Sequence, residues 1–305
     1  MRVAIPEVAD TARPSLSRAN PGGLLIATDG THDADGAVRV GLALARRDAM
    51  PMAMLSVVEP LTLYTPDGIL LPDADELTDI TRESRDAALH MQRDRTHPGM
   101  RDWPFSIETG PRVETIVARA ERTGASLILV GLGAHGVSAR VMQRETALRI
   151  MRAAPVPVLA LPEHAWGVPH TALAAVDFTA SSERAAQAAL GLLGREGTLY
   201  LAHVTPRIAI PQGDSRTWDE ITQSGVFPKL EAVGRRLAPP PGVRIEYVLL
   251  HGEVAHELLA FGEERKIDLI ATGAHGRSAL GRLVLGSVST AVVRAAHCWV
   301  LVAPS

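Results

Sequence analysis

The sequence is built from one unit written twice, and this repeat constrains the fold more than any other feature. Four segments of the first half recur in the second half in the same order. The matching pairs are 24–31 with 173–180, 52–60 with 199–207, 108–136 with 250–276, and 152–162 with 294–304. In the first pair, an apolar run ends in an aspartate, Asp29 or Asp177, with a threonine two residues later. A repeat of this size in a chain of 305 residues predicts two domains of the same fold.

Each half alternates apolar runs with helical patterns. In the second half, strands are predicted near 171–177, 198–204, 243–249, 267–272 and 298–303. Their apolar residues are continuous rather than alternating, which is typical of parallel strands buried on both faces. Helices are predicted over Ser181–Leu193, with Ser181 or Ser182 as the N-cap, and over Val254–Glu264. The predicted fold class is α/β: two repeated, doubly wound, five-stranded parallel-sheet domains of a Rossmann-like type.

The repeat also sets the predicted domain boundaries. They are an N-terminal extension over 1–22, a first domain over 23–163 and a second domain over 170–305. A segment that contains proline and glycine, 161–170, joins the domains.

Composition excludes several classes of partner. The net charge of −3 and the pI near 6.4 do not fit a nucleic acid or an anionic membrane surface. Residues 1–22 lack the apolar core of a secretory signal, and no apolar run reaches the ~20 residues of a membrane span. The only cysteine, Cys298, excludes an internal disulfide and is expected to be a small buried apolar residue. We therefore expect a soluble, cytoplasmic protein.

The segment after the fourth strand of the first half contains a G-x-G-x-x-G string, Gly131 to Gly136. In a dinucleotide-binding fold this string follows the first strand, and an acidic residue closes the next strand. Here it follows the fourth strand, and no acidic residue closes the next one. In our alignment the repeat has Ala271 in place of Gly131. A dinucleotide site is therefore not predicted.

The second half carries a different glycine pattern in the corresponding region. Gly273 is followed by Gly276 and, after nine further residues, by Gly286-Ser287. Glycines let a backbone approach a ligand closely, and the free N–H groups of a helix start bind anions. Parallel sheets place their ligands at the carboxyl ends of the strands, where Asp177, Val204 and this pattern are predicted to meet. The pattern indicates a phosphate site.

The repeated α/β unit, the aspartate after strand one and the G-x2-G-x9-G-S pattern resemble the universal stress protein family in its tandem two-domain form. The resemblance implies ATP as the ligand, with Mg²⁺ accompanying the nucleotide. By position, Asp177 would hold the adenosine moiety and the backbone of Val204 would meet adenine. Gly273 and Gly276 would line the ribose and phosphates, and Gly286, Ser287 and Ser289 would take the phosphates. Thr272 and Val288, which adjoin these residues, complete the candidate set.

A purely structural interpretation stays open for each residue alone. The glycines fit turns, Ser287 fits a helix N-cap, and Asp177 fits a cap for the helix that follows it. Together, at this spacing and at one end of one sheet, they favour binding.

The first half departs from the pattern. The positions equivalent to Gly286-Ser287 fall within 144–147, which reads Arg-Glu-Thr-Ala, and the segment up to the last strand is two residues shorter. Losing the glycine blocks close approach of the backbone. Glu145 would also place a carboxylate near the phosphate position. Arg140, Arg144 and Arg149 could hold an anion in another way, but on a helix they fit a solvated face. One competent nucleotide site, in the second half, is predicted.

Other chemistry is poorly supported by the sequence. His251 and His256 do not have the spacing of a zinc-binding helix, and His135 and His275 have no further ligand at a suitable spacing. The chain has neither a lysine-bearing phosphate loop nor a G-x-S-x-G nucleophile. We expect no metal site formed by protein side chains and no enzyme activity beyond slow hydrolysis of bound ATP.

The predicted role is that of a stress-response sensor or regulator, with a regulatory protein partner that the sequence does not identify. The family resemblance implies that the halves pair through their last strands as a pseudo-twofold dimer within one chain, and a homodimer of chains stays open. Residues Tyr64, Ile69, Leu70 and Leu71, within 61–79, would cover the first crevice or contact a partner. The alternative role is a nucleotide-free interaction module of the same fold.

Overall fold

The computed structural model describes residues 22–60, 74–98, 104–133, 137–205, 218–274 and 285–304. Several predictions fall outside these ranges: the fold of 1–21, the side chains of Tyr64, Ile69, Leu70 and Leu71, both G-A-H-G histidines, and the placement of Gly276. The side chain of Arg140 also lies outside the described part.

The first half follows the predicted alternation of strands and helices. Its elements are β1 (Leu24–Ala27), a short 3₁₀ helix (His32–Ala34), α1 (Asp35–Asp48), β2 (Met52–Val58), α2 (Ala74–Thr96), β3 (Phe105–Thr109), α3 (Arg112–Thr123), β4 (Leu127–Gly131), α4 (Val137–Ala153) and β5 (Val158–Leu161). Residues 74–79, which we expected to belong to a covering loop, instead form the start of α2.

The second half repeats this order. Its elements are β6 (Thr171–Ala175), α5 (Ala180–Leu192), β7 (Thr198–Thr205), α6 (Trp218–Leu237), β8 (Arg244–His251), α7 (Val254–Glu264), β9 (Leu269–Gly273), α8 (Ser287–Ala295) and β10 (Trp299–Ala303). All five strands predicted for this half are confirmed within two residues at each end.

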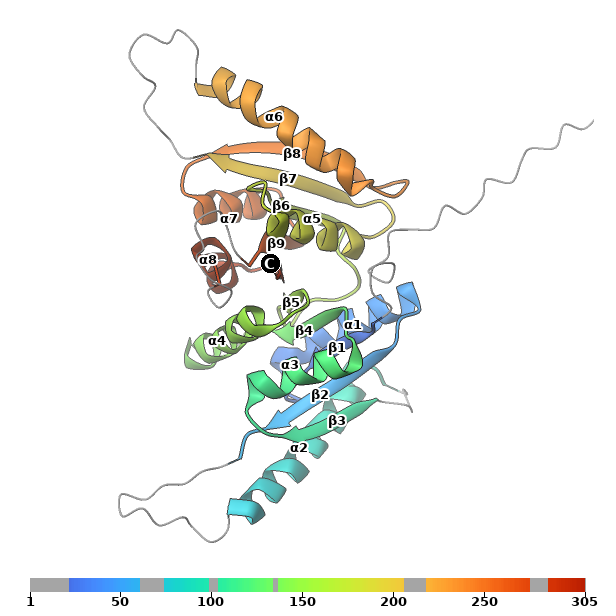
Figure 1. Ribbon diagram of the computed structural model, residues 1–305. Helices are drawn as coiled ribbons and strands as arrows, with labels where there is room; N and C mark the ends of the chain where they lie inside the picture. Colours follow the sequence, from blue (N-terminus) through green and yellow to red (C-terminus); the bar gives the residue numbers. More distant parts are fainter. Residues whose placement is uncertain are drawn as a thin grey trace, which may run out of the picture.

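The two halves share one sheet, with the strand order β3-β2-β1-β4-β5-β10-β9-β6-β7-β8 (Figure 1). Strands within each half are parallel, whereas β5 and β10 pair antiparallel, with Val300 opposite Ala160 and Val302 opposite Val158. The prediction that the halves join through their last strands is confirmed. This pairing removes two apolar edges that would otherwise be exposed.

Helices cover both faces of the sheet, as in other doubly wound folds. Apolar side chains of α1, α5 and α6 form one buried layer, and those of α3, α4, α7 and α8 form the other. Successive strand residues alternate between these layers, so that Leu24 and Ile26 face one and Leu25 faces the other. Both layers run across the β5–β10 pair and therefore join the two halves.

The register of the repeat differs from our sequence alignment, which paired the two G-A-H-G strings. In the structure, Leu127 lies beside Leu24 and Leu269 lies beside Ala172. Leu132 N donates to Leu161 O (2.8 Å), just as Ala274 N donates to Ala303 O (2.7 Å). Gly131 is therefore the equivalent of Gly273. The apparent two-residue deletion disappears, and Arg144 and Glu145 become the equivalents of Gly286 and Ser287.

The predicted N-cap of α5 was wrong. Ser181 and Ser182 are buried inside the helix, and the cap is Thr179, whose Oγ1 accepts from Ser182 N at 3.3 Å. The reason is local: Asp177 Oδ1 accepts from both the N–H and the hydroxyl of Thr179, which fixes Thr179 in the capping position.

Candidate functional site

Three elements of the second half meet at Gly273, the last residue of β9. A Cβ atom at this position would lie 2.5 Å from Ser181 Oγ and 2.8 Å from the Ser181 carbonyl carbon, at the start of α5. From the other side, Ser289 Oγ in the first turn of α8 donates to Gly273 O at 2.7 Å. Gly273 is thus needed for packing, and it brings the starts of α5 and α8 to the carboxyl end of β9.

The start of α8 has no side-chain cap. Its N-cap is Gly286, so Ser287 is the first helical residue and not the cap that the structural interpretation assigned to it. In the same half, α5 is capped by Thr179 and α7 by Glu253, whereas α1 and α3 of the first half also begin without a side-chain cap. Within the described part of the chain, no side chain caps the first-turn N–H groups of Ser287, Val288 and Ser289. Such groups can bind an anion, which the helix dipole also favours.

A buried hydroxyl lies next to this helix start. Thr272, the penultimate residue of β9, is 2% exposed. Its Oγ1 has no hydrogen-bond partner among the described residues. Burying an unpaired hydroxyl is costly, so an added hydrogen-bond partner at this position would be stabilising.

Asp177 serves a turn as well as a candidate site. Its Oδ1 accepts from Thr179 N (3.0 Å) and Thr179 Oγ1 (2.6 Å). In the first half, Asp29 accepts from Thr31 N and Thr31 Oγ1 at the same distances. The aspartate is therefore explained by the turn in both halves, without a ligand.

Phe178 and His203 were missed by the sequence analysis. Phe178 has a positive φ of 66°, which is uncommon for a residue with a side chain. Its ring centroid lies 4.8 Å from that of His203, and His203 Nδ1 lies 2.6 Å from Val176 O. His203 precedes Val204 on β7, and Val204 is partly buried on the opposite face of the sheet. The signal in the sequence was Gly30, the equivalent of Phe178, which has a φ of 77°.

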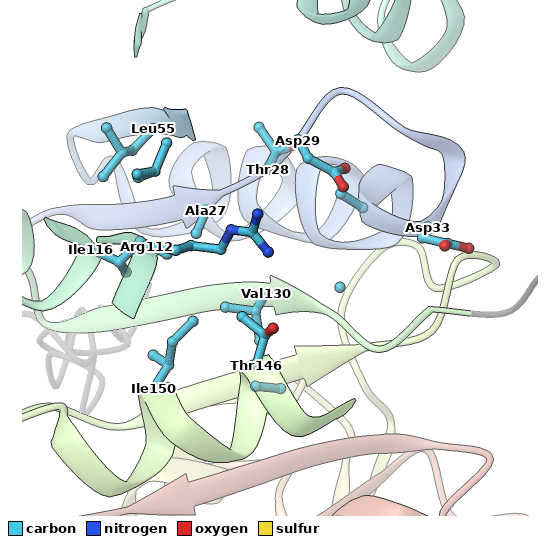
Figure 2. Close-up of a pocket in the computed structure, with 14 residues that line it drawn as sticks. Ala27, Thr28, Asp29, Asp33, Leu55, Arg112, Ile116, Val130, Thr146 and Ile150 are labelled. Atoms are coloured by element: carbon cyan, nitrogen blue, oxygen red, sulfur yellow. The ribbon is translucent and has the colours of Figure 1, made fainter. Parts of the chain in front are cut away.

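The first half has its own crevice at the carboxyl ends of β1 and β4, with a volume of about 90 Å³. Its lining is mainly apolar, with polar groups from Thr28, Asp29, Asp33, Arg112 and Thr146. Figure 2 shows the Arg112 and Thr146 side chains extending toward the space between these strands. Arg112 forms an ion pair with Glu59 (2.9 Å) at the rim.

The phosphate position of the first half is occupied by a continuous helix. Helix α4 begins at Val137 and runs through Arg144 and Glu145, so their backbone N–H groups lie in the helix interior. The expected position of Glu145 was wrong. Its carboxylate pairs with Arg294 (3.1 Å) and Arg152 (3.5 Å), and it does not line the crevice. At this position the phosphate would therefore lack free N–H groups because the helix is continuous, and repulsion by Glu145 is not the reason.

A larger cavity of about 760 Å³ lies near the amino-terminal ends of β6, β9 and β10, beside the segment that joins the halves. It is lined by residues such as Trp166, His170, Lys266, Cys298 and Trp299. Burial raises the pKa of the Cys298 thiol to about 11, so the group is protonated at neutral pH and a poor nucleophile.

Two of the histidines considered as metal ligands, His251 and His256, lie on different elements. His251 ends β8, where its Nδ1 lies 2.7 Å from Thr205 Oγ1, and His256 lies on α7 beyond an intervening turn. Within the described ranges, no three His, Cys, Asp or Glu side chains are grouped as a metal site would require. None of the helices described is long and apolar enough to cross a bilayer.

The fold is that of a tandem α/β protein, with a crevice at the carboxyl ends of the first-half strands. At the corresponding end of the second half, helix α8 begins without a side-chain cap. The chain belongs to the universal stress protein family: the family model matches residues 23–162 and again residues 170–304. Membership follows from the two matches together, which cover most of the chain.

Individual relatives agree with this assignment. A universal stress protein of Mycolicibacterium smegmatis is 24% identical over 288 residues, which cover 92% of this chain and 96% of the relative. Universal stress protein MJ0531 of Methanocaldococcus jannaschii is 36% identical over 106 residues, or 34% of this chain and 61% of the relative. The crystal structure of a universal stress protein from Archaeoglobus fulgidus has the same fold, with a TM-score of 0.63 and 17% identity. It covers 96% of this chain and 98% of its own.

Proposed function

We propose that the protein binds one adenine nucleotide, ATP with Mg²⁺, in the crevice of its second half, and acts as a cytoplasmic stress-response regulator rather than as an enzyme. The observation that carries this proposal is the uncapped start of α8 beside the unpaired hydroxyl of Thr272. A phosphate placed there would accept hydrogen bonds from the free N–H groups and the hydroxyl. Family membership supports the choice of an adenine nucleotide.

The number of sites follows from the difference between the halves. In the first half, α4 continues through the positions equivalent to Gly286 and Ser287, so the N–H groups at these two positions lie within the helix and do not start one. The first half then acts as a pairing or regulatory domain, and the protein partner that reads the nucleotide state is unidentified.

A matched pair of alanine substitutions tests the site. Asp177→Ala and Asp29→Ala remove the same turn hydrogen bonds, one in each half. Only Asp177→Ala is expected to abolish ATP binding, measured by isothermal titration calorimetry with ATP and Mg²⁺. Equal losses in the two variants would contradict a single second-half site.

A second variant tests the helix start without touching the turn. Replacing Gly286-Ser287 by Arg-Glu reproduces the first-half sequence, which is compatible with a helix in this fold. ATP affinity should fall about 100-fold, because several charge-assisted hydrogen bonds to phosphate are lost together. Retained affinity would mean that α8 does not hold the phosphates. A wild-type protein that binds no ATP would favour the nucleotide-free interaction module, and steady phosphate release would indicate an ATPase.

A further inference from the structure

Two arginines of the first half hold the C-terminal ends of two helices of the second half. Arg47, near the end of α1, donates from Nη1 to Leu192 O (2.7 Å) and Leu193 O (3.0 Å), and from Nη2 to Gly191 O (2.7 Å). These are the last carbonyls of α5. Asp48 pairs with the same guanidinium at 2.7 Å and fixes its orientation.

Arg144, on α4, does the same for α8. Its Nη1 donates to Arg294 O and to Val293 O (3.4 Å), and its Nη2 donates to Ala296 O (3.2 Å). Beside it, the Glu145 carboxylate pairs with the Arg294 side chain of α8. The last carbonyls of a helix have no partner within the helix and carry partial negative charge, so a guanidinium fork satisfies them both geometrically and electrostatically.

The two helices held in this way are those that begin at the candidate nucleotide site. Helix α5 follows the Asp177–Thr179 turn, and α8 begins at Ser287. A nine-residue helix such as α8 is only about 14 Å long and behaves as a rigid rod over that length. Fixing its C-terminal end therefore fixes the position of the N–H groups at its start.

The first half has residues that contact α8 at the two positions where the second half has the Gly-Ser pair. Arg144 and Glu145 stand at the positions equivalent to Gly286 and Ser287, and both contact α8. The second half cannot return the contact through these positions, because Gly286 has no side chain and Ser287 has only a short one. The halves are thus asymmetric: one carries the site and the other holds the helices that form it.

We infer that Arg47 and Arg144 are positioning residues for the nucleotide site of the second half, acting from the first half through α5 and α8. This inference rests on the proposed function. By linkage, nucleotide binding should in turn tighten the contact between the halves, because each event stabilises the same placement of α8. Nucleotide binding in the second half would thereby affect the first half, and a partner protein could bind the surface of the first half.

The test compares ATP affinity in full-length variants, again by calorimetry with ATP and Mg²⁺. Arg47→Ala and Arg144→Ala should each weaken binding ~3-fold to 5-fold, and the double variant ~10-fold or more. Arg235→Ala is the control, since this exposed arginine of α6 pairs only with Glu231 on its own helix among the described contacts. Arg144→Lys keeps the charge but not the fork, and should recover part of the affinity lost in Arg144→Ala.

Amide hydrogen exchange over residues 287–295 provides a second readout that needs no nucleotide. In Arg144→Ala these amides should exchange faster than in the Arg235→Ala control, and ATP should restore less protection than in the wild type. If the wild type binds ATP and the double variant binds it equally well, the inference is overturned. If the wild type binds no ATP, the proposed function fails, and unchanged exchange over 287–295 would separately overturn the hold on α8. Should the double alanine variant fail to fold, the Arg→Lys pair replaces it in both measurements.

Discussion

Gly30 and Phe178 occupy equivalent turns of the two halves, and both adopt a positive φ. The turn after the first strand of each half requires a positive φ, which Gly30 adopts freely and Phe178 adopts at a cost of ~1–2 kcal/mol. A Cβ at Gly30 would lie 2.8 Å from Ala88 on α2, so only glycine fits there. In the second half the Phe178 ring instead packs against His203 and the buried layer beneath α5, which compensates for the strain.

Truncating Phe178 separates these two effects. Phe178→Ala and Phe178→Gly both lose the ring, but only glycine relieves the backbone strain. We expect Phe178→Gly to be more stable than Phe178→Ala by about 1 kcal/mol, measured as a difference in denaturation midpoint. The comparison at a strand position, Ala175→Gly in β6, should cost stability instead. An alanine variant as stable as the glycine variant would show that the turn is not strained.

At the scale of elements, a buried polar network attaches α2 to the start of α1. Gln92 accepts from Thr28 Oγ1 (2.7 Å) and donates to Asp35 Oδ1 (2.9 Å). Arg95 donates to both oxygens of the same carboxylate, and hydrogen bonding to Asp35 raises the pKa of Arg95 above its usual value. Asp35 is 2% exposed, so its charge depends on these partners.

Removing Arg95 should therefore be costly. Arg95→Ala is expected to lower the free energy of unfolding by about 2 kcal/mol, because the buried carboxylate loses a bidentate partner. Arg93→Ala, two residues away, removes a pair with the exposed Asp94, which solvent screens, and should cost clearly less. Urea unfolding of the two variants measures the difference, and equal costs would refute the role given to Asp35.

Some features of the elements could be predicted from the sequence, and others could not. The strands were predictable because continuous apolar runs report burial on both faces of a parallel sheet. The register of the repeat was not, because the G-A-H-G strings match better by letter than by position, whereas Gly131 and Gly273 are equivalent through their neighbours in the sheet. The capping role of Thr179 and the α8 contacts of Arg144 depend on side chains that meet only in the folded chain.

Across the whole molecule, one sheet joins two halves of the same fold that have diverged in opposite directions. In the second half a helix begins at Gly286-Ser287 without a side-chain cap, whereas the equivalent residues of the first half, Arg144 and Glu145, lie within α4 and contact α8. On the proposed function, the second half would bind the nucleotide and the first half would support the helices at the site. We propose that the chain has a single nucleotide site, in the second half.

The most direct test of a single second-half site is the nucleotide content of the purified protein after saturation with ATP and Mg²⁺ and removal of unbound nucleotide. The protein is denatured, and the released nucleotide is identified by mass spectrometry and quantified against protein concentration. We expect about one adenine nucleotide per chain after saturation with ATP and Mg²⁺. About two per chain would contradict the loss of the first-half site, and none, even after saturation, would contradict the nucleotide site altogether.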